Sequence, residues 1–191
     1  MKKIIITIII LAVIIVVGYF VYQKNFFSFS YYVEINYDKS CITTKSERVV
    51  RGESLQGIIK NGENIKVWEG YYNCNLVERG DIIIYNYSSE KDPIIKIIKG
   101  LPGDKFALKQ NEAGNYNIIV NNKILNVSTG QPYELTEVKH RMLALYEKDF
   151  KGVIPKDTYL ILGNQTNGSL DSTRFGLIDK KGIIGKVIYK N

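Results

Sequence analysis

The N-terminal part of the sequence contains a long apolar segment that limits how this chain can be arranged. Residues 4–22 are almost entirely aliphatic or aromatic. At about 1.5 Å per residue, a helix of that length nearly spans a hydrocarbon core of about 30 Å. A cleaved signal peptide would have a shorter apolar region followed by small residues, whereas Tyr19 to Phe27 is mostly bulky. We therefore expect a retained membrane anchor.

The charges around this segment predict its orientation. Lys2 and Lys3 precede the apolar segment and favour a cytoplasmic N-terminus, although Lys24 just beyond it weakens the asymmetry. We expect residues 1–24 to form a cytoplasmic stub and a single-pass transmembrane anchor in the cell membrane. Residues 25–191 would then form an extracytoplasmic catalytic domain, with the lipid bilayer as a partner.

Composition indicates one mostly β domain and excludes several classes of function. The chain has 191 residues, and about 170 remain beyond the anchor, enough for one core. Abundant Ile, Tyr, Asn and Gly favour strands and turns. The net charge of +7 is spread without a basic run, so we expect no nucleic-acid partner. One histidine and two distant cysteines lack metal-site spacing, and we expect neither metal nor cofactor.

The two cysteines lie in the part predicted to be outside the cytoplasm. Cys41 and Cys74 could form a disulfide there, and closing a loop of about thirty residues would stabilise the fold by roughly 3 to 4 kcal/mol on the chain-entropy model. Two separate thiols are the alternative.

Short β-branched and aromatic runs separated by turn residues predict the strands. Asn121-Asn122 is a hairpin signal, because asparagine tolerates the positive φ that a two-residue turn requires. We predict a short helix within residues 136–149. The predicted strands are residues 49–50, 64–68, 81–87, 94–99, 116–120, 123–127, 158–162 and 183–189.

One lysine lies inside an aliphatic strand. In Pro93-Ile-Ile-Lys96-Ile-Ile-Lys99, alternation puts Lys96 on the same face as Ile94 and Ile98. Burial would lower the lysine pKa, and a fall of roughly 3 units from about 10.4 would make the neutral amine available as a base near neutral pH. Alternatively, an edge strand would let Lys96 extend its ammonium into water.

A serine between two glycines is the candidate nucleophile. Ser54 stands between Gly52 and Gly57, so the backbone can adopt tight geometry and be approached closely. The same pattern also suits a plain surface turn. A third feature is the loop from Gly163 to Gly176, rich in Asn, Gly, Ser and Asp that can hydrogen-bond their own backbone.

Three segments in this order resemble type I signal peptidases. The serine segment is Gly52-Glu-Ser-Leu-Gln-Gly-Ile-Ile-Lys-Asn-Gly62. The lysine segment is Lys96-Ile-Ile-Lys-Gly-Leu-Pro-Gly-Asp104, preceded by Arg79-Gly-Asp. The third segment runs from Gly163 to Gly176, with Gly185-Lys186 after it. The resemblance covers nearly the whole chain behind the predicted anchor.

The resemblance implies a signal-peptidase-like antiparallel β domain with a Ser/Lys dyad that removes signal peptides after small residues. Ser54 would be the nucleophile and Lys96 its general base. The Ser54 N–H, with the backbone at Gly52 where some members have a serine, would bind the oxyanion. Ser169 matches a serine that hydrogen-bonds the lysine, and Asp171 matches a structural acid.

Several positions depart from the family pattern and affect the expected specificity more than the activity. Leu55 replaces the usual Met, and Gln56-Gly57 replaces a segment that contains Pro. The other departures are Ile97, Lys99, Asn164 where Asp is typical, and Arg174, one residue later than usual.

Two other functions are compatible with these residues. A specialised maturation peptidase for a pilin or conjugation protein would share the dyad and differ in substrate range. A non-catalytic tethered binding module of the same fold could recognise exported chains through an extended cleft. The presence of both Ser54 and Lys96 argues against the binding module.

Overall fold

The computed structural model describes residues 15, 16, 18, 19, 37–88 and 92–189. The chain divides into two compact units, Met1–Asp38 and Lys39–Asn191. In the first unit, the four described positions from 15 to 19 are helical, and none of the described helices is both long and apolar enough to cross a membrane. The rest of the predicted span, residues 4–22, and the predicted boundary after residue 24 lie outside the described residues and stay predictions.

The second unit is mostly β, as predicted, with antiparallel pairing throughout its described strands. Its helices are α2 (Glu137–Asp149), α3 (Ser172–Phe175) and the 3-10 helices η1 (Lys39–Cys41), η2 (Tyr71–Asn73) and η3 (Lys180–Gly182). Its strands are β1 (Thr44–Val49), β2 (Asn64–Glu69), β3 (Ile82–Tyr85), β4 (Ile94–Gly100), β5 (Phe106–Gln110), β6 (Tyr116–Val120), β7 (Lys123–Ile124), β8 (Glu134–Leu135), β9 (Thr158–Leu162), β10 (Ile178–Asp179) and β11 (Ile183–Ile188).

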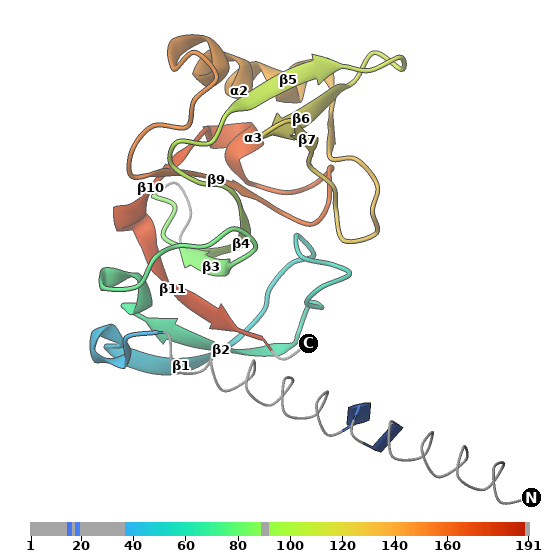
Figure 1. Ribbon diagram of the computed structural model, residues 1–191. Helices are drawn as coiled ribbons and strands as arrows, with labels where there is room; N and C mark the ends of the chain where they lie inside the picture. Colours follow the sequence, from blue (N-terminus) through green and yellow to red (C-terminus); the bar gives the residue numbers. More distant parts are fainter. Residues whose placement is uncertain (1–14, 17, 20–36, 89–91, 190–191) are drawn as a thin grey trace, which may run out of the picture. The chain divides into compact units, whose positions relative to one another are not determined.

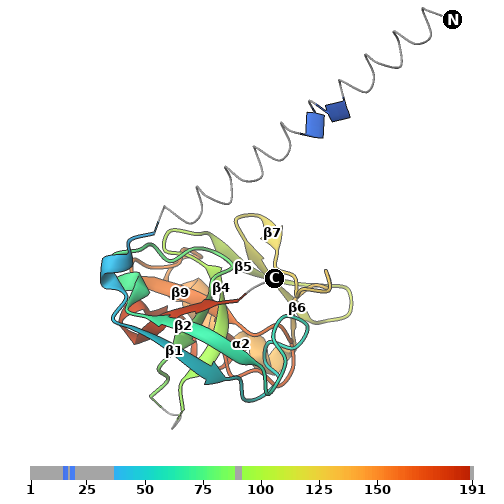
Figure 2. The ribbon, with the colours of Figure 1, turned by 90° about the horizontal axis from the view of Figure 1, so that it is seen from below.

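The strands form two sheets. The larger sheet has the order β1-β2-β11-β3-β4-β9-β10, and the smaller has β5-β6-β7 with β8 also paired to β6. Within this unit, α2 and α3 lie with the smaller sheet at one end, while β1, β2 and β11 lie at the other (Figure 1). The view from below looks onto β1 and β2, with α2 behind them (Figure 2). Strands β4 and β9 run between these two ends, so residues at their termini can reach loops of both sheets.

The buried apolar side chains form two clusters. The first cluster takes side chains from β2, β3, β4 and β11 and includes Leu55 and Ile59 from the serine segment. The second takes Leu160 and Leu162 of β9 together with residues of the smaller sheet and Leu143 of α2. Because a buried leucine or isoleucine contributes about 1.5 to 3 kcal/mol, Leu55 and Ile59 hold the serine segment onto the larger sheet.

Most predicted elements are confirmed. Strand β9 has the predicted bounds, and the hairpin from β6 to β7 turns at Asn121 and Asn122, with φ of 49° and 65°. The helix predicted within residues 136–149 is α2, which has thirteen residues. Strand β3 is shorter than the predicted strand at both ends. At its start, the Asp81 carboxylate accepts the Glu78 N–H, so residue 81 belongs to a turn, and at its end the strand stops at Tyr85.

Two ion pairs explain why charged residues flank these strands. Arg79 contacts Asp104 at 2.6 Å and also donates to the Lys99 carbonyl, which joins the start of β3 to the end of β4. Lys186 of β11 contacts Asp81 at 2.7 Å. Both carboxylates are nearly buried. These two ion pairs therefore hold β3 in place against β11 and against β4, the strand that carries Lys96.

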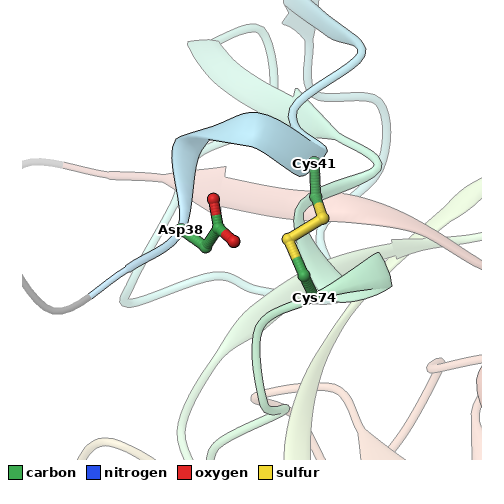
Figure 3. Close-up of side chains that lie close together, drawn as sticks. All are labelled: Asp38, Cys41 and Cys74. Atoms are coloured by element: carbon green, nitrogen blue, oxygen red, sulfur yellow. A yellow bond between two sulfur atoms is a disulfide. The ribbon is translucent and has the colours of Figure 1, made fainter.

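The cysteines are close together in space. Figure 3 shows Cys41 and Cys74 joined through their sulfur atoms. Their Cα atoms are 5.9 Å apart. That separation lies within the range of protein disulfides. The bridge would tie η1 to the residue after η2. Oxidation of the pair in the protein stays a prediction.

Candidate active site

Strand β4 places Lys96 in an apolar environment. Lys96 pairs with Ile83 on β3, which is fully buried, and the lysine itself is only 3% exposed. Alternation along β4 sends Ile95 and Ile97 into the first buried cluster, while Lys96 points to the opposite face. Because Lys96 is almost fully buried, its ammonium does not extend into water, and the edge-strand alternative for Lys96 is wrong.

Burial changes the acid–base properties of this lysine. Loss of hydration lowers the pKa of Lys96 from 10.5 to about 8, and the negative charge of Asp171 partly opposes that change. The Nζ donates to the carbonyl of Ile95 at 2.7 Å. A neutral amine bonded in this way keeps its lone pair for another partner. Lys96 is therefore a candidate base near neutral pH.

The serine segment begins where β1 ends and forms a compact loop closed by β2. Val50 and Glu63 pair across its base, and Gly62 donates back to the Val50 carbonyl. Gly52 and Gly57 have φ of 87° and 90°, a left-handed conformation that costs other residues strain. Between them Leu55 is 1% exposed, whereas Ser54 is half-buried. The loop thus presents the Ser54 hydroxyl beside a buried anchor.

The structure brings Ser54 and Lys96 into contact. The Lys96 Nζ lies 3.0 Å from the Ser54 Oγ, although the residues are 42 positions apart in the sequence. This distance lies within the hydrogen-bonding range expected for a nucleophile and its base. The pair can therefore transfer a proton directly from the hydroxyl to the amine.

An open cleft of about 550 Å³ leads to this pair. Six of its described lining residues are Val or Ile, and four carry charged side chains. The lining residues are Arg48, Val49, Val50, Arg51, Ser54, Ile65, Ile84, Asp92, Pro93, Ile94, Ile95 and Lys96. On the side of β4 away from β3, the pairing with β9 begins only at Ile97, so residues 94–96 have no β9 partner. The cleft can accept an extended peptide with apolar side chains.

The two oxyanion candidates differ in availability. The Gly52 N–H donates to the Asn61 side chain at 3.1 Å, so it is already engaged. Within the described part of the chain, the Ser54 N–H has no acceptor. The Ser54 amide can therefore donate to a developing oxyanion beside its own hydroxyl.

The third segment supports the site through a fully buried carboxylate. Asp171 caps α3 by accepting the Thr173 N–H at 3.1 Å and its hydroxyl at 2.7 Å. The other carboxylate oxygen accepts the Gly163 N–H and the Tyr133 hydroxyl, both at 2.9 Å. Burial, followed by this negative charge, raises the pKa of Tyr133. These contacts agree with a structural role for Asp171.

Ser169 does not make the contact expected of it. Its Oγ is buried without a hydrogen-bond partner among the described residues, so the hydrogen bond to Lys96 is not formed. The hydroxyl lies beside Gly163, where a Cβ would collide with it and come within 2.8 Å of the Ser54 carbonyl oxygen. Ser169 is therefore close to the serine segment, but its role toward Lys96 stays a prediction.

The histidine of this chain is not the partner of Ser54. The single histidine, His140, stacks on Tyr116 with ring centroids 3.9 Å apart. The serine's basic partner here is thus a lysine rather than an imidazole.

Asn164 and Ser128 are site residues whose roles the sequence analysis missed. In the sequence, Asn164 differs from the residue that is typical of the family pattern, and nothing in the sequence marks Ser128. In the structure, the Asn164 N–H donates to the Ser54 carbonyl at 2.6 Å, and its side chain bonds both Gln56 and Ser128. No periodic pattern marks such contacts, because they join loops more than thirty residues apart.

The known proteins to which this chain is similar are all signal peptidases in the comparisons given below. The family model described as signal peptidase, peptidase S26, matches residues 1–190. Signal peptidase IB of Staphylococcus aureus (strain COL) is 31% identical over 152 residues, 74% of each chain. Signal peptidase I P of Bacillus subtilis subsp. natto is 32% identical over 139 residues, 72% of this chain and 71% of the relative. A signal peptidase I crystal structure from Enterococcus faecalis V583 matches with a TM-score of 0.42 at 22% identity, covering 59% of this chain and 97% of that one.

Proposed function

This chain belongs to the signal peptidase family, peptidase S26, and we propose that it removes signal peptides from exported preproteins with a Ser54–Lys96 dyad. The observation that carries the proposed dyad is the 3.0 Å contact between the Lys96 Nζ and the Ser54 Oγ in an apolar site. The aliphatic cleft beside this contact suits an extended segment of a signal peptide. Cleavage after small residues is part of the same proposal.

The proposed reaction uses this chain's own groups. The Ser54 Oγ attacks the scissile carbonyl as the neutral Lys96 amine takes the hydroxyl proton. The Ser54 N–H then donates to the oxyanion, a contact worth on the order of 3 to 4 kcal/mol in the transition state. Lys96 passes its proton to the leaving amine, which departs and leaves an acyl ester on Ser54. A water deprotonated by Lys96 then attacks that ester, and the carboxyl product leaves as Lys96 returns the proton to the Ser54 Oγ, which restores the serine and the neutral amine.

Membrane attachment is the second element of the proposal. The apolar segment at residues 4–22 would anchor the enzyme beside the bilayer in which signal peptides reside. The Lys2 and Lys3 pair supports a cytoplasmic N-terminus, with residues 25–191 outside the cytoplasm. No observation favours a specialised maturation peptidase or a non-catalytic module over a general signal peptidase.

Cleavage of a purified preprotein by the detergent-solubilised full chain tests the dyad. Ser54→Ala and Lys96→Met should both abolish cleavage, because each removes one partner of the proton transfer, while the circular dichroism spectrum stays that of the parent. Lys99→Met is the matched control, since Lys99 lies on the same strand and its Nζ bonds the Asn126 carbonyl. Cleavage by Lys96→Met at the parental rate would refute the assignment of the base.

A further inference from the structure

Three loops meet at the side chain of Asn164. One is the serine segment, and the second follows β7 in the smaller sheet. The third is the loop after β9, and this loop contains Asn164 (Figure 1). The Asn164 Nδ2 donates to the Gln56 carbonyl at 2.7 Å and to the Ser128 Oγ at 2.6 Å. Its Oδ1 accepts the Ser128 N–H at 2.8 Å. Asn164 is 6% exposed, whereas Gln56 and Ser128 lie at the surface, so these bonds are partly buried.

We propose that Asn164 and Ser128 are positioning residues, which hold the serine segment at a fixed distance and angle from β4, the strand that carries the general base Lys96. We call these two residues the clamp. This inference rests on the proposed dyad and adds to it the groups that align it. The Asn164 N–H and side chain bond the carbonyls of residues 54 and 56, so one residue fixes the loop at two points around Ser54. Two directional bonds define the rotation of the loop as well as its distance.

The position of Asn164 connects this clamp to Lys96. Asn164 is the second residue after β9, and β9 pairs with β4 at Ile97 and Leu162, directly beside Lys96. Ser54 is therefore linked to Lys96 by two routes, the direct contact and the path through Asn164, β9 and β4. Burial of Leu55 also holds the loop, but apolar burial has no direction and does not set the angle of the hydroxyl.

Close packing around the junction agrees with this role. A Cβ at Gly57 would lie 3.1 Å from the Ser128 Oγ and 3.2 Å from the Asn164 Nδ2. The backbone at Gly57 therefore packs tightly against the side chains of Ser128 and Asn164, and a larger residue at position 57 would crowd them. Ser128 anchors the clamp to the smaller sheet, because its loop is closed by the bond from the Val127 N–H to Gln131.

The test measures kcat and KM of the full chain in detergent with one preprotein substrate. A nucleophile displaced by a fraction of an ångström loses rate rather than binding, so Asn164→Ala should lower kcat by about 30-fold with KM within about threefold of the parent. Ser128→Ala should lower kcat by about fivefold, the equivalent of one neutral hydrogen bond. In the Asn164→Ala background, Ser128→Ala should have no further effect, because both act through the same contact.

Two controls separate positioning from structural support. Gln165→Ala removes an exposed bond between the side chains of Gln165 and Gln56 in the same two loops and should leave kcat within about twofold. For Asn164→Ala, kcat should be lower than that of the parent at every pH, while the apparent pKa of its pH profile stays at the parental value. A pKa that rises toward 10.5 would mean that water has reached Lys96, and it would overturn the positioning role in favour of a packing role.

The outcomes distinguish the clamp from the dyad. If Ser54→Ala and Lys96→Met are inactive while Asn164→Ala retains the parental kcat, the clamp is wrong and the dyad stands. If Lys96→Met remains active, the dyad itself fails. Should Asn164→Ala not fold, Ser128→Ala decides alone, and an unchanged kcat in that variant refutes the clamp.

Discussion

The pH dependence of cleavage provides the most quantitative prediction. A general base works only in its neutral form, and burial lowers the pKa of Lys96 to about 8. About one tenth of the Lys96 amines are then neutral at about pH 7 and about nine tenths at about pH 9. The value of kcat/KM should therefore rise about tenfold over this range and level off. A lysine with the ordinary value of 10.5 would give a rise of about a hundredfold without levelling.

The assay is a set of initial rates of preprotein cleavage at subsaturating substrate, from about pH 6 to about pH 10. At low substrate concentration the rate reports kcat/KM and so the free enzyme's pKa. Lys99→Met should reproduce the parental profile, because Lys99 lies three residues further along β4 and does not contact Ser54. A profile that still climbs steeply at about pH 10, or one that Lys99→Met shifts, would refute the reasoning that burial of Lys96 supplies the base.

Two further predictions concern stability and the cysteines. Lys96 has a lower pKa when folded, so its cost to stability is complete below about pH 8 and disappears as pH rises to its unfolded value. Urea unfolding at neutral pH should accordingly show Lys96→Met to be more stable than the parent by up to about 3 kcal/mol. If the variant and the parent are equally stable both at neutral pH and near pH 10.5, this prediction is wrong. Non-reducing mass analysis should find Cys41 linked to Cys74, a bridge that spans 33 positions and adds about 3 to 4 kcal/mol; two free thiols in oxidised material would exclude it.

The sequence predicted those parts of the fold that follow from local periodicity. The strand around Lys96, the strand at residues 158–162 and the asparagine hairpin were all readable, because alternation and turn chemistry are properties of neighbouring residues. The glycines around Ser54 and the isoleucines around Lys96 mark the two residues of the proposed dyad in the sequence, together with the resemblance to type I signal peptidases. Their 3.0 Å contact required tertiary structure, since no local rule relates positions 54 and 96.

Contacts between loops were the part that the sequence could not give. The expected bond from Ser169 to Lys96 is absent, because the Ser169 Oγ lies against Gly163 and Lys96 bonds Ile95 and Ser54 instead. The predicted strand at residues 49–50 covers only the last residue of β1, and strands β5, β8 and β10 have no counterpart among the predicted strands. Strand β8 and strand β10 have only two residues each, too few for a periodic signal, and depend on partners elsewhere in the chain.

Direct titration of the Lys96 amine tests the central claim of an uncharged lysine beside the nucleophile. The measurement is a heteronuclear NMR titration of lysine side chains in the detergent-solubilised protein, with Lys96→Met used to assign the signal. A pKa of about 8 for Lys96 is the predicted result. A Lys96 signal that titrates near 10.5 would show a solvated ammonium and would contradict the proposed mechanism.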